Sequence, residues 1–161
     1  MPLPPNLSAL IFLDYDGVLQ TPKLSYWREF EYLPALESIL RDYPDVGIVV
    51  SSTHRFGRTP ETLRMPYAPD IRPRVLGGTP DLVCGDADGG RFDEIRQWLD
   101  DNCAAHMPWV ALDDERRRFP DECANLMWVS PYGGFDDFQE EELRERLDGL
   151  LAQAAATSLQ P

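Results

Sequence analysis

The stretch Ala9–Pro22, ALIFLDYDGVLQTP, contains the feature that decides the fold. An unbroken apolar run ends in two aspartates, Asp14 and Asp16, and a glycine follows the second at once. A short continuous apolar run is typical of a strand that is covered on both faces. Carboxylates are costly to bury unless they are paired, hydrogen-bonded or bound to a metal. We therefore expect a buried strand that delivers both aspartates to a polar rim.

Further apolar runs alternate along the chain between strand-like and helix-like patterns. The strand-like runs are 45–52, 73–82, 109–114 and 124–130. The helix-like runs are 31–44, 58–64, 91–102 and 138–156. Alternation of this kind predicts βαβ units. We expect an α/β, three-layer Rossmann-like fold with a mostly parallel central sheet, formed as one domain over residues 1–161 with its core at about 7–156.

Composition and charge narrow the classes of partner. The chain has 161 residues and a formal net charge of −13, which argues against broad binding to nucleic acid or to anionic membranes. The net charge does not exclude a local basic patch. No apolar run is long enough to span a bilayer, so we expect no membrane partner. The three cysteines form no CxxC pair, which predicts reduced thiols, a cytoplasmic protein and no disulfide-linked partner.

Acids and hydroxyls follow three of the predicted strands at the point where each strand ends. In a parallel sheet these carboxyl ends form the edge at which ligands bind. The residues at the three ends are Asp14, Asp16, Ser51, Ser52, Thr53, Asp113 and Asp114. Several carboxylates without a histidine or cysteine cluster favour a hard cation, above all Mg²⁺. Hydroxyls and free backbone N–H groups suit phosphate oxygens, so the pattern indicates metal-assisted phosphate chemistry.

Four motifs in this order resemble those of the haloacid dehalogenase-like hydrolase superfamily. FLDYDGVL is similar to its first motif, IVVSS to its second and WVALDD to its fourth. VVSSTHR, RVLGGTP and GRFDEIRQWL, taken with WVALDD, resemble the small branch found in Swiss Army Knife RNA repair proteins. The resemblance covers roughly Leu7 to Val129. The chain departs from the SSWR pattern of that branch at Thr53 and His54 and keeps Arg55.

The resemblance implies roles for the carboxylates. Asp14 would be the nucleophile that forms an aspartyl-phosphate, and also a metal ligand. Asp16 would be the general acid and base, with its backbone carbonyl at the metal. Asp113 or Asp114 would complete a Mg²⁺ site, and the sequence leaves open which of the two is the direct ligand.

The resemblance also implies a phosphate-binding set. Ser51 would bind the transferred phosphoryl group, with Ser52 close behind. The third motif of the superfamily is normally a lysine, but Lys23 is the only lysine here and lies in the wrong place. Arg91 occupies the matching position, and arginine can hold phosphate through two parallel hydrogen bonds.

Other polar residues have a plainer explanation beside the functional one. A lone DxD after a strand can be a turn or a helix cap. His54 and His106 have no partner at ligand spacing and are expected to be structural or exposed. The run Arg116–Arg118 is expected to be solvated, with the alternative that Arg116 contacts substrate. Arg55 is a second candidate for such a contact.

Two functions remain open from the sequence. The first is a Mg²⁺-dependent phosphohydrolase that cleaves a phosphomonoester, and the second is a non-catalytic module that binds a protein or nucleic acid. The spans 17–46 and 55–91 are too short to build a cap domain with its own core. An uncovered site predicts a large or loosely selected phosphorylated substrate. We rank a nucleic-acid end or nucleotide first, and a phosphoprotein or small phosphate ester second.

Overall fold

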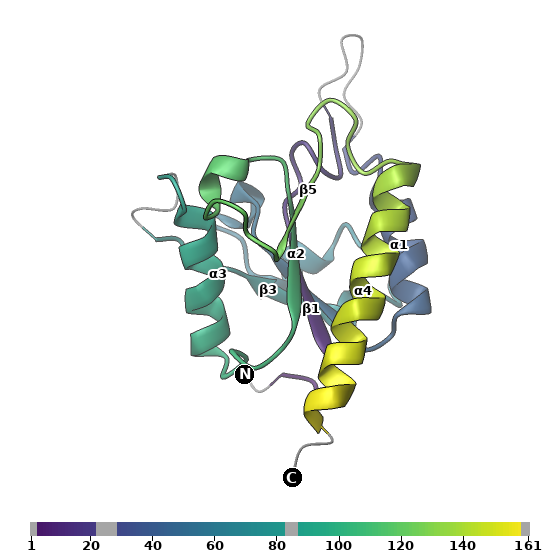
Figure 1. Cartoon of the computed structure of the whole chain (residues 1–161). Coiled ribbons are helices and arrows are strands. Elements are labelled where there is room, and N and C mark those ends of the chain that lie inside the picture. Colours follow the sequence, from purple (N-terminus) through teal and green to yellow (C-terminus); the bar gives the residue numbers. More distant parts are fainter. Residues whose placement is uncertain (1–2, 22–28, 83–86, 159–161) are drawn as a thin grey trace.

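Five parallel strands form a single sheet at the centre of the molecule (Figure 1). The structure is a computed structural model that describes residues 3–21, 29–82 and 87–158. The strand order is β3-β2-β1-β4-β5, with β1 in the middle. The strands are β1 (Ala9–Leu13), β2 (Val46–Val50), β3 (Val75–Gly78), β4 (Trp109–Asp113) and β5 (Leu126–Trp128). The expected α/β Rossmann-like fold is confirmed, and every strand pairing in the described sheet is parallel.

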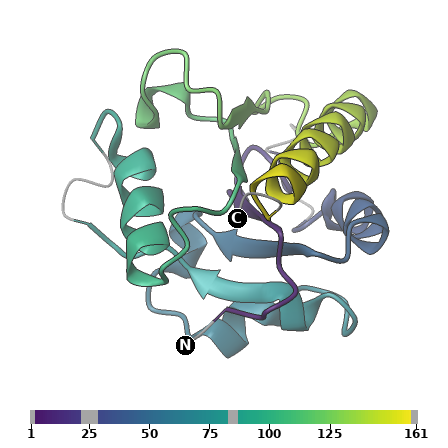
Figure 2. The same ribbon diagram turned by 60° about the horizontal axis from the view of Figure 1, so that its bottom comes forward.

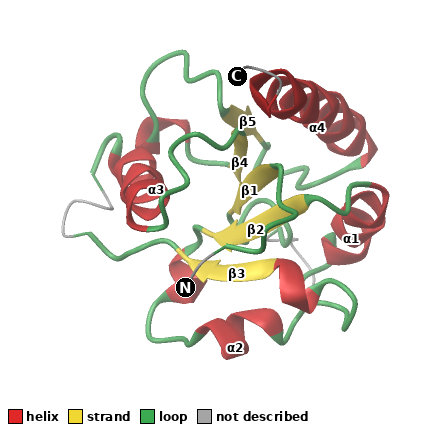
Figure 3. Cartoon of the chain, turned by 90° about the horizontal axis from the view of Figure 1, so that it is seen from below, coloured by secondary structure: helices red, strands yellow, loops and turns green. Residues whose placement is uncertain are grey.

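Helices cover both faces of this sheet. The four α-helices are α1 (Leu33–Asp42), α2 (Pro60–Arg64), α3 (Gly90–Asp101) and α4 (Asp137–Ser158). Figure 2 shows α3 on one side of the sheet and α1 beside α4 on the other. Figure 3 shows α2 next to the edge strand β3. Short 3₁₀ turns η1 (Thr53–Arg55), η2 (Arg72–Arg74) and η3 (Arg116–Arg118) lie in the connections.

Side chains of β1 alternate between two apolar layers. Ile11 and Leu13 belong to the core under α1 and α4, whereas Leu10 and Phe12 belong to the core under α3. All five residues of the strand are fully buried. Because both faces of the sheet are covered, the strand reads as a continuous apolar run and not as an alternating one.

Aromatic packing under α3 and a side-chain cap at α2 stabilise these elements. The Phe12 ring makes edge-on contacts with Trp98 and Trp109, at 5.6 and 5.5 Å between ring centroids. Both tryptophans therefore belong to the packing of the α3 layer. At the start of α2, the Thr59 hydroxyl accepts a hydrogen bond from the Thr62 N–H, as expected of an N-cap.

The site edge of the sheet carries no substantial cap in the part of the chain that the structure describes. Between β2 and α3 that part contains only η1, α2, η2 and β3. No described helix is long and apolar enough to cross a membrane. Cys103 and Cys123 are free thiols, and Cys84 lies outside the described residues.

Candidate active site

The ends of β1, β2 and β4 bring three polar residues to one edge of the sheet. Leu13 lies opposite Val50 on one side and Leu112 on the other. The residues that follow these positions are Asp14, Ser51 and Asp113. The Asp14 N–H donates to the Leu112 carbonyl, and the Ser51 N–H donates to the Leu13 carbonyl. The ladder itself therefore fixes the backbone from which these side chains project.

Three carboxylates converge at this edge. One oxygen each of Asp14, Asp113 and Asp114 lies within 4.8 Å of the others. The Tyr15 N–H donates to Asp14 Oδ1 at 2.8 Å, and the Glu115 N–H donates to Asp113 Oδ1 at 2.8 Å. Asp14 and Asp113 are buried, whereas Asp114 is half-buried. The structure thus brings together Asp14 of the first predicted motif and both acids of the fourth.

Gly17 makes room for this acidic cluster. Its φ is +77°, a left-handed conformation that residues with a Cβ rarely adopt. A Cβ built at this position would collide with the carboxylate of Asp114. The glycine after the second aspartate is therefore required by the turn and by the close approach of Asp114.

Arg91 provides the positive charge at the cluster. It lies in the first turn of α3 with 1% of its surface exposed. Its Nη1 is 2.8 Å from Asp113 Oδ2 and 3.5 Å from Asp14 Oδ2. Its Nε and the Ser51 hydroxyl are both buried without a hydrogen-bond partner among the described residues. The Ser52 hydroxyl, in contrast, hydrogen-bonds Asp14.

Burial dominates the electrostatics of these groups. It raises the pKa of the Asp14 carboxyl, and the nearby Arg91 offsets only part of this effect. Burial and the charge of Asp14 raise the pKa of Asp113 well above its ordinary value, and the pKa of Asp114 to about 6. Burial opposes the charge on Arg91, but Asp113 and Asp14 outweigh it and raise the pKa of the guanidinium. One guanidinium among three carboxylates leaves an excess of negative charge that a divalent cation would balance.

Asp16 lies apart from this cluster. Half of its side chain is exposed, and its carboxylate is not among the three that converge. Gln20 Nε2 donates to Asp16 Oδ1 at 2.6 Å, and His54 Nε2 is 3.3 Å from Asp16 Oδ2. The spacing of the histidines in the sequence did not indicate this contact, and a structural role for His54 stays a prediction. The sequence contained a usable signal, because Asp16 and His54 follow neighbouring parallel strands by a few residues each; no comparable signal indicated Gln20.

Arg55 makes its contacts within the protein. It is buried, and its Nη2 is 2.6 Å from Glu94 Oε2. Its other N–H groups donate to backbone carbonyls of the loops after β2 and β3, namely those of Ser51, Ser52, Thr79 and Pro80. Arg55 thus makes a structural contact between two loops and α3, and its predicted contact with substrate stays a prediction. The side chain is long enough to reach inward, which its place in the sequence does not reveal.

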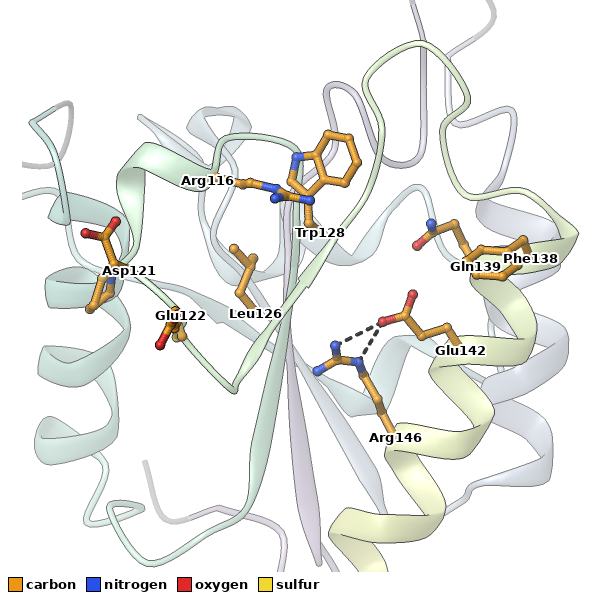
Figure 4. Close-up of a pocket in the computed structure, with 11 residues that line it drawn as sticks. Arg116, Asp121, Glu122, Leu126, Trp128, Phe138, Gln139, Glu142 and Arg146 are labelled. Carbon is orange, nitrogen blue, oxygen red and sulfur yellow. Dashed lines mark hydrogen bonds and ion pairs between the residues drawn. The ribbon is translucent and has the colours of Figure 1, made fainter.

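Arg116 lies at a cavity of about 550 Å³ beside the edge strand β5. Figure 4 shows its side chain extending from η3 to Trp128, with the guanidinium carbon 4.2 Å from the ring centroid. The indole N–H of Trp128 donates to the Asp114 carbonyl at 2.8 Å. Trp128 thus links Arg116 to Asp114 of the acidic cluster. The contact of Arg116 with substrate stays a prediction. This cavity does not contain the cluster itself.

The family follows from a comparison with known proteins. A family model described as the HAD domain in Swiss Army Knife RNA repair proteins matches residues 10–139. No curated protein and no solved structure matches the chain. The matched region contains β1, β2, α3 and β4, which together position the acidic cluster and Arg91. The expected resemblance is confirmed, and the chain belongs to the family of HAD domains, or haloacid dehalogenase-like domains, of Swiss Army Knife RNA repair proteins.

Proposed function

We propose that this protein is a Mg²⁺-dependent phosphohydrolase that cleaves a phosphomonoester through an aspartyl-phosphate. The observation that carries the proposal is the convergence of three carboxylates and Arg91 at the carboxyl edge of the sheet. Beside them, the Ser51 hydroxyl and Arg91 Nε are buried donors with no partner among the described residues. Buried polar groups are normally hydrogen-bonded, so both donors fit the oxygens of a bound phosphoryl group.

The donor set fits a magnesium ion. Asp14, Asp113 and Asp114 offer oxygen ligands only, and none of the cluster is a histidine or cysteine. Hard cations such as Mg²⁺ prefer this set and commonly bind one or two carboxylates together with substrate phosphate. We assign the three side chains to the metal, together with the backbone carbonyl of Asp16. Bound Mg²⁺ would neutralise charge between the carboxylates and the phosphate.

Asp14 is the proposed nucleophile. Its Oδ1 accepts the Tyr15 N–H, so the carboxylate is held in one orientation, and its Oδ2 faces Arg91. A carboxylate oxygen of Asp14 forms the bond to phosphorus as the bond to the leaving oxygen breaks. Asp16 gives a proton to that leaving oxygen, and then takes one from the water that hydrolyses the aspartyl-phosphate.

The phosphate contacts come from the second and third motifs. Ser51 and Arg91 are the proposed ligands of the transferred phosphoryl group. Ser52 is a weaker candidate because its hydroxyl already bonds Asp14. Arg91 takes the place of the usual lysine, and Lys23 lies outside the described residues.

An open site favours a substrate whose phosphate projects from a larger molecule. No cap covers the cluster in the described part of the chain, and pockets for small ligands normally bury most of the ligand surface. We therefore propose a nucleic-acid end or a nucleotide as substrate, with a phosphoprotein or a small phosphate ester as second choice. The family description points in the same direction. We further propose that residues 1–161 form one domain, and that the protein is cytoplasmic with reduced thiols.

The test compares substrates under matched conditions. Purified protein is given p-nitrophenyl phosphate, oligonucleotides phosphorylated at either end, a phosphopeptide and a panel of small phosphates, with Mg²⁺ or with EDTA. We expect Mg²⁺-dependent release of phosphate and the highest kcat/KM on a nucleic-acid end. Binding of an oligonucleotide without turnover of any ester would instead support the non-catalytic module. Selective turnover of one small metabolite would contradict the substrate class.

A further inference from the structure

Asp16 is held in place although half of it faces solvent. Its two carboxylate oxygens have different partners, Gln20 Nε2 at 2.6 Å from Oδ1 and His54 Nε2 at 3.3 Å from Oδ2. An exposed carboxylate with no partner would exchange among several rotamers. A general acid must instead stay within hydrogen-bond reach of the atom that it protonates. Both partners therefore restrict the orientation of the Asp16 carboxyl, as the proposed role of Asp16 requires.

Gln20 is itself fixed from the far side. The side chain is buried, and its Oε1 accepts the Phe30 N–H at 3.2 Å. Because this bond requires an acceptor, it places the amide oxygen toward Phe30 and directs the NH₂ group at Asp16. The Gly17 N–H also donates to the Gln20 carbonyl at 2.8 Å. The loop after β1 therefore closes on itself and returns a donor to its own carboxylate.

His54 reaches Asp16 from the neighbouring strand. It lies in η1, directly after β2, and its backbone N–H donates to the Ser52 hydroxyl at 3.3 Å. Its ring packs against Tyr15 with 5.5 Å between ring centroids, and 28% of the side chain is exposed. A ring nitrogen can donate to a carboxylate or accept from a carboxylic acid. His54 can therefore hold Asp16 in both of its protonation forms.

We propose that Gln20 and His54 are positioning residues that hold the Asp16 carboxyl toward the oxygen of the leaving group. The inference rests on the proposed phosphohydrolase function. In the first step an Asp14 oxygen bonds to phosphorus, the bond from phosphorus to the ester oxygen breaks, and the Asp16 proton passes to that oxygen to form an alcohol. Esters of ordinary alcohols need this proton, whereas p-nitrophenolate leaves as a stable anion. The pair therefore adapts the site to phosphate esters of aliphatic alcohols.

The test is the ratio of kcat/KM for ethyl phosphate to that for p-nitrophenyl phosphate. His54→Phe keeps a ring against Tyr15 but removes both nitrogens. We expect the ratio to fall about 100-fold, the scale of a misplaced catalytic group. His54→Gln, whose amide N–H can still reach Asp16, should restore part of it. Gln20→Glu keeps the bond to the Phe30 N–H but places a carboxylate against Asp16, and should also lower the ratio.

The matched control is His106→Phe. His106 is exposed and precedes β4, so it lies toward the amino ends of the strands, whereas Asp16 lies at the carboxyl ends. The ratio should therefore be unchanged. The rise in Tm on adding Mg²⁺ should be the same in His54→Phe and in the wild type, which separates positioning from damage to the cluster. An equal loss on both esters in His54→Phe, with an active wild type, overturns the inference alone. A wild type that releases phosphate from neither ester, and from none of the phosphorylated substrates of the preceding test, overturns the proposed function and the inference together.

Discussion

Two buried arginines have contrasting surroundings: Arg91 belongs to the first turn of α3, and Arg55 reaches this helix from η1. Arg55 pairs with Glu94 of this helix, and carbonyl or carboxylate oxygens match all five of its N–H groups. Arg91 faces Asp14 and Asp113, and its Nε has no partner among the described residues. The first cluster is balanced in charge and in hydrogen bonds, whereas the second has acids and donors in excess. The Arg55 cluster is therefore what a purely structural contact looks like, whereas the unmatched groups of the Arg91 cluster are what a ligand-binding site requires.

Removing the proposed nucleophile should break the contrast most completely. Asp14→Asn keeps the shape of the side chain but removes its charge, and we expect kcat to fall about 10³-fold or more because no aspartyl-phosphate can form. The measurement is steady-state release of phosphate with Mg²⁺. The metal-free Tm should not fall, because one of several crowded buried charges is removed. Turnover close to that of the wild type would refute the role of Asp14.

Arg91 tests whether the unmatched donor serves the phosphate. Arg91→Met should lower kcat/KM about 100-fold, the scale of losing one charged contact to a transition state. Arg91→Lys should restore part of this loss, because an ammonium supplies the charge without the fork of parallel donors. Both variants are assayed with saturating Mg²⁺, where the cluster keeps a cation. A full loss in Arg91→Met with no gain in Arg91→Lys would show that geometry, and not charge, is the requirement.

Arg55 should behave in the opposite way. Arg55→Met leaves the Glu94 carboxylate buried without its cation, which we expect to cost about 3 kcal/mol of the free energy of unfolding. The remaining folded protein should keep kcat/KM within about threefold, because Arg55 contacts Ser51 and Ser52 only at their backbone carbonyls and contacts none of the side chains that we assign to phosphate or metal. Urea unfolding measures the first quantity.

A double-mutant cycle provides the control for Arg55. Glu94→Leu added to Arg55→Met should recover part of the lost stability, since the orphaned charge is removed. Additive losses would mean that the pair does not act as a unit. A large loss of kcat/KM in folded Arg55→Met would support the predicted substrate contact.

The smallest effect concerns pH and metal. The pKa of Asp114, about 6, lies above its ordinary value of 3.8, so between these values the folded chain binds a proton that the unfolded chain has lost. The free energy of unfolding of the metal-free protein should therefore fall as the pH rises through this window. We expect a higher Tm at pH 5 than at pH 7.5 in EDTA. Mg²⁺ should raise the Tm at pH 7.5 by a few degrees, because it binds the folded state alone.

Two variants separate local from global effects in that experiment. Lower pH also reduces the self-repulsion of a chain with a net charge of −13. Asp114→Asn should show a smaller difference in Tm between the two pH values than the wild type. The double variant Asp113→Asn/Asp114→Asn should show no rise with Mg²⁺. An unchanged rise in that variant would place the metal elsewhere.

The strands and their polar ends were predictable because they depend on local pattern. Five buried residues followed by Asp14 describe a strand that ends at a rim, and parallel pairing then brings Ser51 and Asp113 beside it. The four helices were predictable from spacing, with boundaries that differ by a few residues at most of their ends. What the sequence carried was the order and type of the elements, and through them the convergence of the motifs.

Contacts between long side chains were not predictable in the same way. Arg55 follows the second motif directly, yet its guanidinium points inward. It pairs there with Glu94 of α3, and Gly78 leaves space beside its alkyl chain. Gln20 reaches Asp16 from the loop that the Gly17 N–H closes, and the Phe30 N–H orients its amide, a pair of contacts that no periodicity indicates. Direction of a flexible side chain depends on partners that are distant in sequence, and only the folded chain shows them.

Gly17 has a consequence for how this chain can change. Every substitution there meets two obstacles at once, a left-handed backbone and the carboxylate of Asp114 in the space that a Cβ would fill. In a library randomised at position 17 and selected for turnover, glycine alone should survive. In a library selected for folding alone, asparagine should return as well, since it tolerates this backbone best and folding does not require the Asp114 carboxylate to keep its place. Residues that survive only the selection for folding are excluded at position 17 by function. Residues that survive neither selection are excluded by the fold.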